Sequence, residues 1–281
     1  MRAFLLCLLV SLASIPARAA VVQIEVRPGI PASAEYLAAG TDKPAVLLLH
    51  GFLQTRTFAT VATLAHGLHE AGHTVLSPTL SLGIPGRETS LACEAVHAHS
   101  LDDDVAELAG WITWLESRGH QSIVLVGHSF GSMQLLAYLA RSPDPAVKGY
   151  IATSLTEAQI GDLPRAELIA RLEHQIRSGD HALVTQRLSF CQNYLSTPQA
   201  LLSYLRWDQA RTVAALRTVP VATQLVMGDS DQHLERGWIK SLRRMRVPVA
   251  IVQGANHFMD GEHEFELLDH VLGFLQRLGG R

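Results

Sequence analysis

The sequence has no cluster of lysine and arginine, no internal repeat and no low-complexity linker. Its 23 basic and 26 acidic residues give a formal net charge of −3 at pH 7. A mildly acidic chain without a basic cluster binds nucleic acid and anionic membrane surfaces poorly, so we expect neither as a partner. Because no repeat or linker divides the 281 residues, they suit one domain of ordinary α/β size.

Long apolar runs are also lacking, apart from a short one at the N-terminus. Met1-Arg2 is positively charged, residues 3–15 are apolar apart from serines, and Ala17-Arg18-Ala19 is typical of a cleavage site. This run is shorter than the roughly 20 apolar residues of a membrane span, and no later run is longer. We therefore expect a signal peptide at 1–19, cleaved after Ala19, and a secreted or periplasmic protein without stable membrane insertion. The alternative is an uncleaved anchor.

Cysteine is scarce as well. Cys7 lies in the expected signal peptide, which leaves Cys93 and Cys191. An even pair in an exported protein permits one disulfide, although only the geometry of the fold decides whether it forms. The alternative is a pair of buried, small apolar side chains.

Apolar periodicity predicts alternating strands and helices over most of the chain. Such alternation implies an α/β fold with a mostly parallel central sheet and helices on both faces. Pro78 is expected to end the third strand, and a loop is expected at 80–100. The strands are expected at 21–26, 45–49, 74–76, 122–126, 149–153, 221–227 and 247–252. The helices are expected at 58–70, from 102 to about 115, and at 132–140, 234–245 and 262–278.

A different period occupies residues 156–218. Segments 167–178, 181–195 and 198–216 all have helical periodicity, with no strand between them. We expect a helical lid that folds over the carboxyl ends of the strands, where such sheets bind ligands. The predicted organisation is a first core part at 20–155, the lid at 156–218 and a second core part at 219–281.

A Gly-x-Ser-x-Gly motif is the most informative feature of the chain. An apolar strand pattern ends in Gly127-His128-Ser129-Phe130-Gly131 and continues as a helix. A serine on a sharp strand-to-helix turn holds its hydroxyl above the sheet, where backbone N–H groups point at the group that it attacks. Glycines two residues to either side let the neighbouring backbone pack against the turn.

Two further motifs each follow an expected strand. They are Gly228-Asp229-Ser230-Asp231 and Gly254-Ala255-Asn256-His257. A serine hydroxyl needs an adjacent base, for which His257 is the candidate, and a carboxylate would fix the tautomer of that histidine. His263 and His270 fall inside the last expected helix, where a solvated or packing role is favoured.

In this order of nucleophile, acid and histidine, the chain resembles α/β-hydrolase-fold serine hydrolases, a family of esterases, lipases and peptidases. The resemblance covers essentially the whole mature length. It implies a catalytic triad of Ser129, Asp231 and His257. The acid loop of the family usually reads Gly-x-x-Asp, which favours Asp231 and leaves Asp229 as a turn-forming alternative.

The resemblance also assigns an oxyanion hole. His50-Gly51-Phe52 follows the expected strand at 45–49 and matches the His-Gly-x segment of the family. The backbone N–H groups of Phe52 and Phe130 are therefore expected to form the hole, with the two rings beside the acyl group. His50, Gly51 and His128 are expected around the substrate, with the His50 ring mainly bracing its loop.

These residues predict an exported serine hydrolase that cleaves an ester or thioester of a moderately apolar small molecule through an acyl-enzyme. The scheme requires no metal and no organic cofactor, and the sequence leaves the oligomeric state open. Apolar residues of the lid favour such a substrate, unless they only pack the lid onto the core. These residues are Leu195, Leu201, Leu202, Tyr204 and Trp207.

Two other functions remain open on the same scaffold. An aminopeptidase or amidase is favoured if acidic lid residues such as Glu157, Asp162 or Glu173 point at the substrate. A non-catalytic binding protein is the second alternative.

The loop at 80–100 is expected to border the entrance of the site. His97 and His99, near Glu94, lack a third ligand at metal-site spacing, so we interpret them as exposed or packing side chains. A disulfide between Cys93 and Cys191 would clasp this loop to the lid.

Overall fold

The computed structural model describes residues 19–141, 143–156, 165–245 and 247–280. The expected signal peptide, up to residue 18, lies outside the described residues, as do Glu157 and Asp162. Within the described ranges, no helix is both long enough and apolar enough to cross a bilayer.

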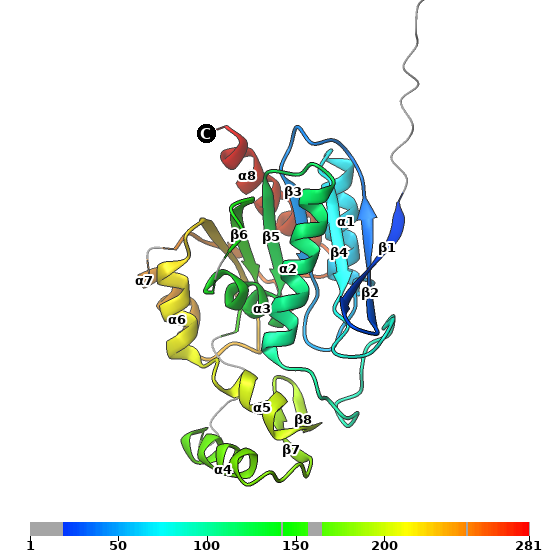
Figure 1. Ribbon diagram of the computed structural model, residues 1–281. Helices are drawn as coiled ribbons and strands as arrows, with labels where there is room; N and C mark the ends of the chain where they lie inside the picture. Colours follow the sequence, from blue (N-terminus) through cyan, green and yellow to red (C-terminus); the bar gives the residue numbers. More distant parts are fainter. Residues whose placement is uncertain (1–18, 142, 157–164, 246, 281) are drawn as a thin grey trace, which may run out of the picture.

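The central sheet has eight strands (Figure 1). They are β1 (Ala20–Arg27), β2 (Ile30–Leu37), β3 (Ala45–Leu49), β4 (Val75–Thr79), β5 (Ile123–His128), β6 (Val147–Thr153), β9 (Ala222–Gly228) and β10 (Val249–Val252). Their order across the sheet is β1-β2-β4-β3-β5-β6-β9-β10. The pairs β1–β2 and β2–β4 are antiparallel, and the other pairs are parallel. The expected mostly parallel sheet is therefore confirmed.

Helices cover both faces of this sheet, so its central strands, such as β3 and β5, are fully buried. On one face lie α1 (Ala59–Glu70) and α8 (His263–Gly279), which contribute Leu64, Leu68, Leu267 and Val271 to one apolar cluster. On the other face lie α2 (Leu101–Ser117), α3 (Phe130–Leu139), α6 (Gln209–Thr218) and α7 (Trp238–Arg244). Because helices cover both faces of the sheet, a ligand site is expected at the carboxyl ends of the strands.

Two strands differ from the sequence-based expectation. No strand was expected at β2, whose buried residues are the small Ala32, Ser33 and Ala34 and, at its end, Leu37, without a clear alternation of apolar and polar residues. The strand before Pro78 was expected to stop there, but β4 continues to Thr79. The pairing of β4 with β3 covers only Val75 and Leu76, so Pro78 lies beyond it, where a strand tolerates a missing N–H.

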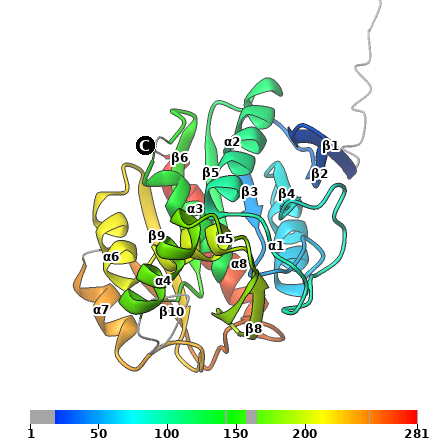
Figure 2. The same cartoon turned by 60° about the horizontal axis from the view of Figure 1, so that its bottom comes forward.

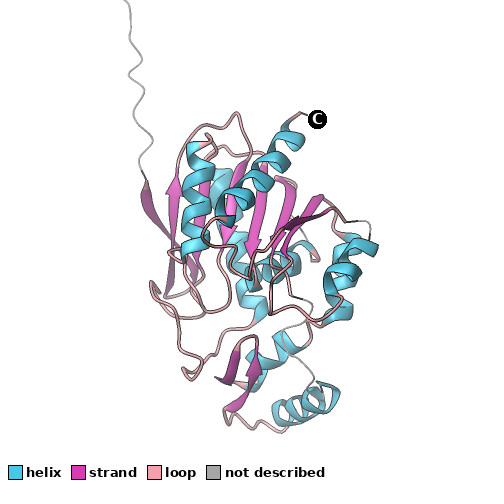
Figure 3. Ribbon diagram, turned by 180° about the vertical axis from the view of Figure 1, so that it is seen from behind, coloured by secondary structure: helices cyan, strands magenta, loops and turns pink. Residues whose placement is uncertain are grey.

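An insertion segment, which we define as residues 165–218, separates β6 from β9. It contains α4 (Arg165–Arg177), β7 (Val184–Leu188), β8 (Cys191–Ser196), α5 (Pro198–Leu205) and α6. With the carboxyl edge of the sheet turned forward, α4 and α5 lie in front of α3 (Figure 2). The strands β7 and β8 pair antiparallel as a hairpin apart from the main sheet (Figure 3).

The expected helix at 181–195 is therefore wrong. Ser189, between the two strands of the hairpin, has a φ of 52°, a left-handed value at which a helix cannot continue. On β8, the Leu195 N–H donates to the Cys93 carbonyl, and the Leu195 carbonyl accepts from the His97 N–H. These bonds to a distant loop outweigh a local helical periodicity, as tertiary contacts commonly do.

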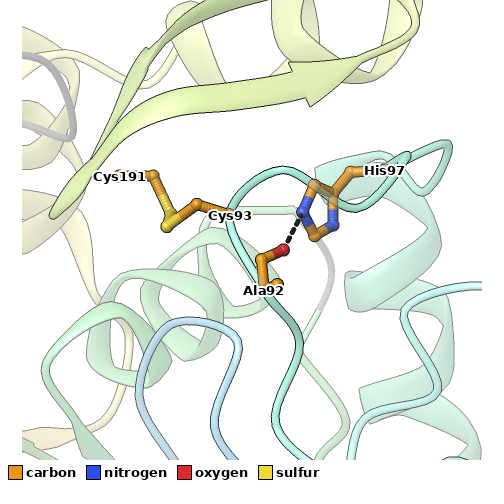
Figure 4. The surroundings of a disulfide bond; sticks show 4 residues. All are labelled: Ala92, Cys93, His97 and Cys191. Carbon is orange, nitrogen blue, oxygen red and sulfur yellow. Dashed lines mark hydrogen bonds between the residues drawn. A yellow bond between two sulfur atoms is a disulfide. The ribbon is translucent and has the colours of Figure 1, made fainter.

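A disulfide joins Cys93 to Cys191, which decides between the two possibilities that the sequence left open (Figure 4). It connects the loop at 80–100 to the first residue of β8. Beside it, His97 Nε2–H donates to the Ala92 carbonyl at 3.1 Å, which fixes the turn that carries Cys93. The loop and the insertion segment are therefore linked both covalently and through backbone hydrogen bonds.

Replacing both disulfide cysteines by serine is expected to destabilise the protein by about 3–5 kcal/mol. The bond spans a sequence separation of 98 residues, so the unfolded chain gains considerable conformational freedom without it. For a chain of this size, that loss corresponds to a Tm lower by roughly 10 °C. Thermal denaturation of Cys93→Ser/Cys191→Ser, with wild type in reductant as control, measures it. An unchanged Tm would contradict the expectation.

Buried Asp104 links α2 to the insertion segment. Its Oδ2 accepts hydrogen bonds from the Tyr204 hydroxyl at 2.5 Å and from Gln134 Nε2 at 2.7 Å. Burial raises the pKa of Asp104 to about 7, because it penalises the carboxylate more than the two hydrogen bonds favour it. In the folded protein, the Asp104 carboxyl group is therefore protonated at pH values below about 7.

The raised pKa of Asp104 predicts a stability that falls as the pH rises. Between about pH 4 and pH 7 the Asp104 carboxyl group is protonated in the folded state and ionised in the unfolded state. Its contribution to the free energy of unfolding therefore falls by about 1.4 kcal/mol for each pH unit. This contribution is complete below the unfolded pKa and is lost as the pH rises towards the folded value. Asp104→Asn, neutral at every pH, is expected to flatten the decline. Urea unfolding of wild type and Asp104→Asn at several pH values across this range tests the prediction. If the free energy of unfolding falls with pH at the same rate in both proteins, the prediction is wrong.

Candidate active site

Ser129 occupies the sharp turn between β5 and α3. Its φ of 55° and ψ of −120° are unusual for a residue with a Cβ, and its side chain is partly exposed. The backbone after β3 packs directly on this turn. A Cβ at Gly131 would lie 2.3 Å from the His50 carbonyl oxygen, so only glycine permits the approach.

Ser129, His257 and Asp231 form one hydrogen-bonded chain. The Ser129 hydroxyl donates to His257 Nε2 at 2.8 Å, and His257 Nδ1–H donates to Asp231 Oδ2 at 2.7 Å. His257 and Asp231 are buried on the loops after β10 and β9. Asp229 lies apart from this chain, with its Oδ1 accepting from the Gly254 N–H at 2.6 Å. The structure thus brings together the three residues favoured by the sequence.

The electrostatic surroundings keep Asp231 ionised. Burial by itself raises the pKa of the carboxyl group. Hydrogen bonds from His257 and from the His233 backbone N–H, together with the charges of the two rings, outweigh that effect and lower the pKa below its usual value. An ionised carboxylate accepts a hydrogen bond from the Nδ1–H of His257, which keeps the proton of the neutral ring on Nδ1 and leaves Nε2 free to accept the serine proton.

Two hydroxyl groups hold the loop that carries His257, and the sequence reasoning missed both. Ser154 Oγ donates to the His257 carbonyl at 2.6 Å, and Thr60 Oγ1 donates to the Phe258 carbonyl at 2.7 Å. Each residue is far from His257 in the sequence, and serine and threonine are common in such places. No motif marks them, so only the fold reveals the contacts.

The loop after β3, here called the β3 loop (residues 50–54), lies beside Ser129. A Cβ built on Gly51 would be 3.5 Å from the Ser129 Cβ. Neither the Phe52 N–H nor the Phe130 N–H donates a hydrogen bond to another described residue. Two adjacent backbone donors without acceptors can bind a developing negative charge, as the sequence reasoning expected for this pair.

The His50 ring braces the β3 loop. Its Nδ1–H donates to the Gly51 carbonyl at 2.8 Å, and its Nε2 accepts the Leu80 N–H at 3.1 Å. Burial, helped by the charge of Arg87, lowers the pKa of His50 to about 3, so the ring is neutral. Both ring nitrogens are used within the protein, which favours a structural role over contact with substrate.

His128 is also buried and neutral. Its Nδ1–H donates to Thr153 Oγ1 at 3.2 Å, and burial, with a smaller effect of His257, lowers its pKa to about 3. Its Nε2 has no hydrogen-bond partner among the described residues. Of the three residues expected around the substrate, Gly51 abuts Ser129, whereas the two histidines lie in the interior.

Aromatic side chains surround the Ser129–His257 pair. The Phe52 ring packs 4.5 Å from that of Phe130 and 5.6 Å from that of Phe190, which is 55% exposed. The partly exposed Phe258 ring lies 5.4 Å from the His257 ring. These rings give the surroundings of the serine an apolar character.

The apolar residues of the insertion segment that were considered for substrate binding mostly pack in the core. Leu195 is half-buried, and the other four are fully buried, namely Leu201, Leu202, Tyr204 and Trp207. Glu173, one of the acids considered for an aminopeptidase, pairs instead with Arg206 at 2.8 Å. Neither observation from the insertion segment therefore identifies a substrate.

His97 and His99 are buried packing residues. The His97 ring stacks on Tyr194 at 4.3 Å, and the His99 ring meets Tyr204 edge to face at 5.8 Å. Among the described residues, one group could supply three metal ligands, namely Asp231, His233 and His257. Two of its members already belong to the hydrogen-bonded chain of Ser129.

Comparisons with known proteins agree with this fold. The family model described as "Alpha/beta hydrolase family" matches residues 46–269. The alpha/beta hydrolase GrgF from Penicillium sp. sh18 is 17% identical with a TM-score of 0.73, over 94% of this chain and 100% of its own. The monoacylglycerol lipase from Paleococcus ferrophilus is 17% identical with a TM-score of 0.65, over 88% and 99%. Est1E from Butyrivibrio proteoclasticus is 15% identical with a TM-score of 0.64, over 93% and 99%. No curated protein sequence matches the chain.

Proposed function

The chain belongs to the alpha/beta hydrolase family, and we propose that it is an exported serine hydrolase cleaving a carboxylic ester or thioester of a moderately apolar small molecule. The observation that carries the proposal is the hydrogen-bonded chain from Ser129 through His257 to Asp231. It lies beside two backbone N–H groups that have no acceptor among the described residues. This is the set of groups that acyl transfer requires.

In the first half of the proposed reaction, Ser129 Oγ attacks the carbonyl carbon while His257 Nε2 takes its proton. The carbonyl oxygen becomes an oxyanion, to which the Phe52 and Phe130 N–H groups donate hydrogen bonds. The tetrahedral intermediate then collapses. His257 returns the proton to the departing alcohol or thiol, and the acyl group stays on Ser129.

In the second half, a water molecule attacks the acyl carbon and gives its proton to His257. Collapse of this intermediate releases the carboxylic acid, and the same proton restores the Ser129 hydroxyl. Asp231 remains a carboxylate throughout and stabilises the imidazolium each time it forms.

The aromatic surroundings of Ser129 support an apolar acyl or leaving group. Phe190 and Phe258 both expose part of their rings next to the residues that would handle the carbonyl. Burying such rings against a hydrocarbon substrate is favourable by about 25 cal/mol per Å² of apolar surface. An aminopeptidase would instead need an acid for the substrate ammonium, and Glu173 is engaged by Arg206.

Export is part of the proposal. The charged start, short apolar run and Ala17-Arg18-Ala19 are typical of a signal peptide. The disulfide between Cys93 and Cys191 supports it, because disulfides persist in oxidising compartments and are rare in the cytosol.

A fluorophosphonate probe tests the proposal on the purified protein. We expect one probe per chain, mapped to Ser129 by mass spectrometry, and hydrolysis of p-nitrophenyl esters in a series from acetate to laurate. A folded protein that neither labels nor hydrolyses esters would favour the non-catalytic binding protein. Faster cleavage of an aminoacyl p-nitroanilide than of every ester would favour the aminopeptidase.

A further inference from the structure

Arg87 is a buried cation in the loop after β4, and only 4% of its surface is exposed. All five of its N–H groups have acceptors. Nε donates to Leu80 O at 2.7 Å, Nη1 to Thr89 O at 2.9 Å and Leu53 O at 3.5 Å, and Nη2 to Gln54 O at 2.8 Å and His50 Nε2 at 3.4 Å. Three of these five acceptors belong to the β3 loop.

The partners of Arg87 are unusual for a buried cation. No carboxylate among the described residues forms an ion pair with it, and the opposite charge with the largest effect on its pKa is that of Glu107. Burial lowers the pKa of Arg87 to about 10, with Glu107 opposing the shift, so the guanidinium stays charged at neutral pH. Because the planar guanidinium donates to backbone carbonyls of both the β3 loop and the loop after β4, it fixes the position of one loop relative to the other.

The β3 loop needs such support because one of its residues is strained. Leu53 has a φ of 57°, which is left-handed and unfavourable for a leucine. A residue in this region keeps its conformation only when its surroundings hold it there. Arg87 donates to the carbonyl of Leu53 and to that of Gln54, on the residues immediately after Phe52.

We propose that Arg87 is a positioning residue that holds the β3 loop in the strained shape in which the Phe52 N–H faces the carbonyl attacked by Ser129. The inference rests on the proposed function. Arg87 does not touch the reacting atoms. It acts through the Leu53 and Gln54 carbonyls and through the ring of His50, which braces the same loop from within by donating to the Gly51 carbonyl. Without this support, the donor at Phe52 is displaced from the developing oxyanion.

Arg87→Lys tests the proposal, with Arg56→Lys as the matched control. Lysine keeps the charge, but its donors radiate from one nitrogen and cannot reach carbonyls on two loops. Arg56 is also buried, at 8% exposed, and it binds Glu88 and the hydroxyls of Ser33 and Thr79 rather than the β3 loop carbonyls. We expect Arg87→Lys to lower kcat for p-nitrophenyl esters about 10²-fold with little change in KM, and Arg56→Lys to leave both unchanged.

Hydrogen–deuterium exchange gives a second readout that needs no activity. The peptide covering 50–58 is expected to exchange faster in Arg87→Lys than in wild type and in Arg56→Lys. Equal losses of kcat in the two variants, or unchanged exchange in Arg87→Lys, would overturn the inference. If wild type hydrolyses no ester, the proposed function fails, and the exchange data alone decide whether Arg87 holds the loop. Should Arg87→Lys not fold, Arg87→Gln, which retains two donors, takes its place.

Discussion

The Ser129→Ala variant is expected to lose about 10⁵- to 10⁶-fold in kcat for ester hydrolysis. Among the residues that the structure describes, the serine oxygen is the one hydrogen-bond partner of His257 Nε2, so its removal leaves the base without a nucleophile to activate. The remaining rate would come from water attacking a carbonyl that is still bound and polarised by the Phe52 and Phe130 N–H groups. Steady-state hydrolysis of p-nitrophenyl butyrate, together with loss of fluorophosphonate labelling, measures the effect.

A matched control separates catalysis from folding. Ser132 lies in α3, the helix that follows Ser129, and is buried, and its Oγ donates to the Gly127 and Thr153 carbonyls rather than to His257. Ser132→Ala is therefore expected to lower the Tm while retaining labelling at Ser129. Ser129→Ala, which deletes an oxygen at a partly exposed turn, is expected to keep its Tm. Retention of labelling in Ser129→Ala would show that another residue is the nucleophile.

The second large effect is expected at Asp231, where asparagine should lower kcat about 10⁴-fold. Asparagine has the shape of the carboxyl group but carries an N–H₂ group that can face His257 Nδ1. The ring would then hold its proton on Nε2, the nitrogen that must accept the Ser129 proton. The kcat of Asp231→Asn for p-nitrophenyl butyrate, compared with wild type at neutral pH, measures the loss.

Asp229→Asn serves as the control for Asp231→Asn. Its carboxylate accepts from the Gly254 N–H and has no contact with His257, so the substitution is expected to leave kcat nearly unchanged. A loss at Asp229 as large as that at Asp231 would assign the acid to the other residue, the alternative that the spacing of the acid loop left open.

The sequence was sufficient for the core of the fold and for the three residues of the hydrogen-bonded chain. Ser129, Asp231 and His257 each follow an apolar strand, and the carboxyl ends of parallel strands meet at one edge of the sheet. The apolar strand patterns in the sequence are therefore enough to predict that these three residues, although distant in the chain, lie close together. The spacing after Gly228 also favoured the aspartate that the structure places next to His257.

The features that the sequence could not predict depend on long-range contacts. The segment at 181–195 has a helical period, yet it forms the β7–β8 hairpin, whose second strand bonds to residues 93 and 97. Arg87 lies in a glycine- and proline-bearing loop, where a solvated arginine is the usual interpretation of sequence. Its burial becomes visible only once the β3 loop is placed beside it.

The disulfide bears on how the protein should be handled. Cys191 is the neighbour of Phe190, whose exposed ring lies against Phe52 beside Ser129, so the bond that secures β8 also sets the position of an aromatic surface at the reaction site. Purification or assay in a thiol-containing buffer is therefore expected to shift the preferred acyl chain length as well as the Tm. Substrate profiles recorded with and without reductant are therefore expected to differ.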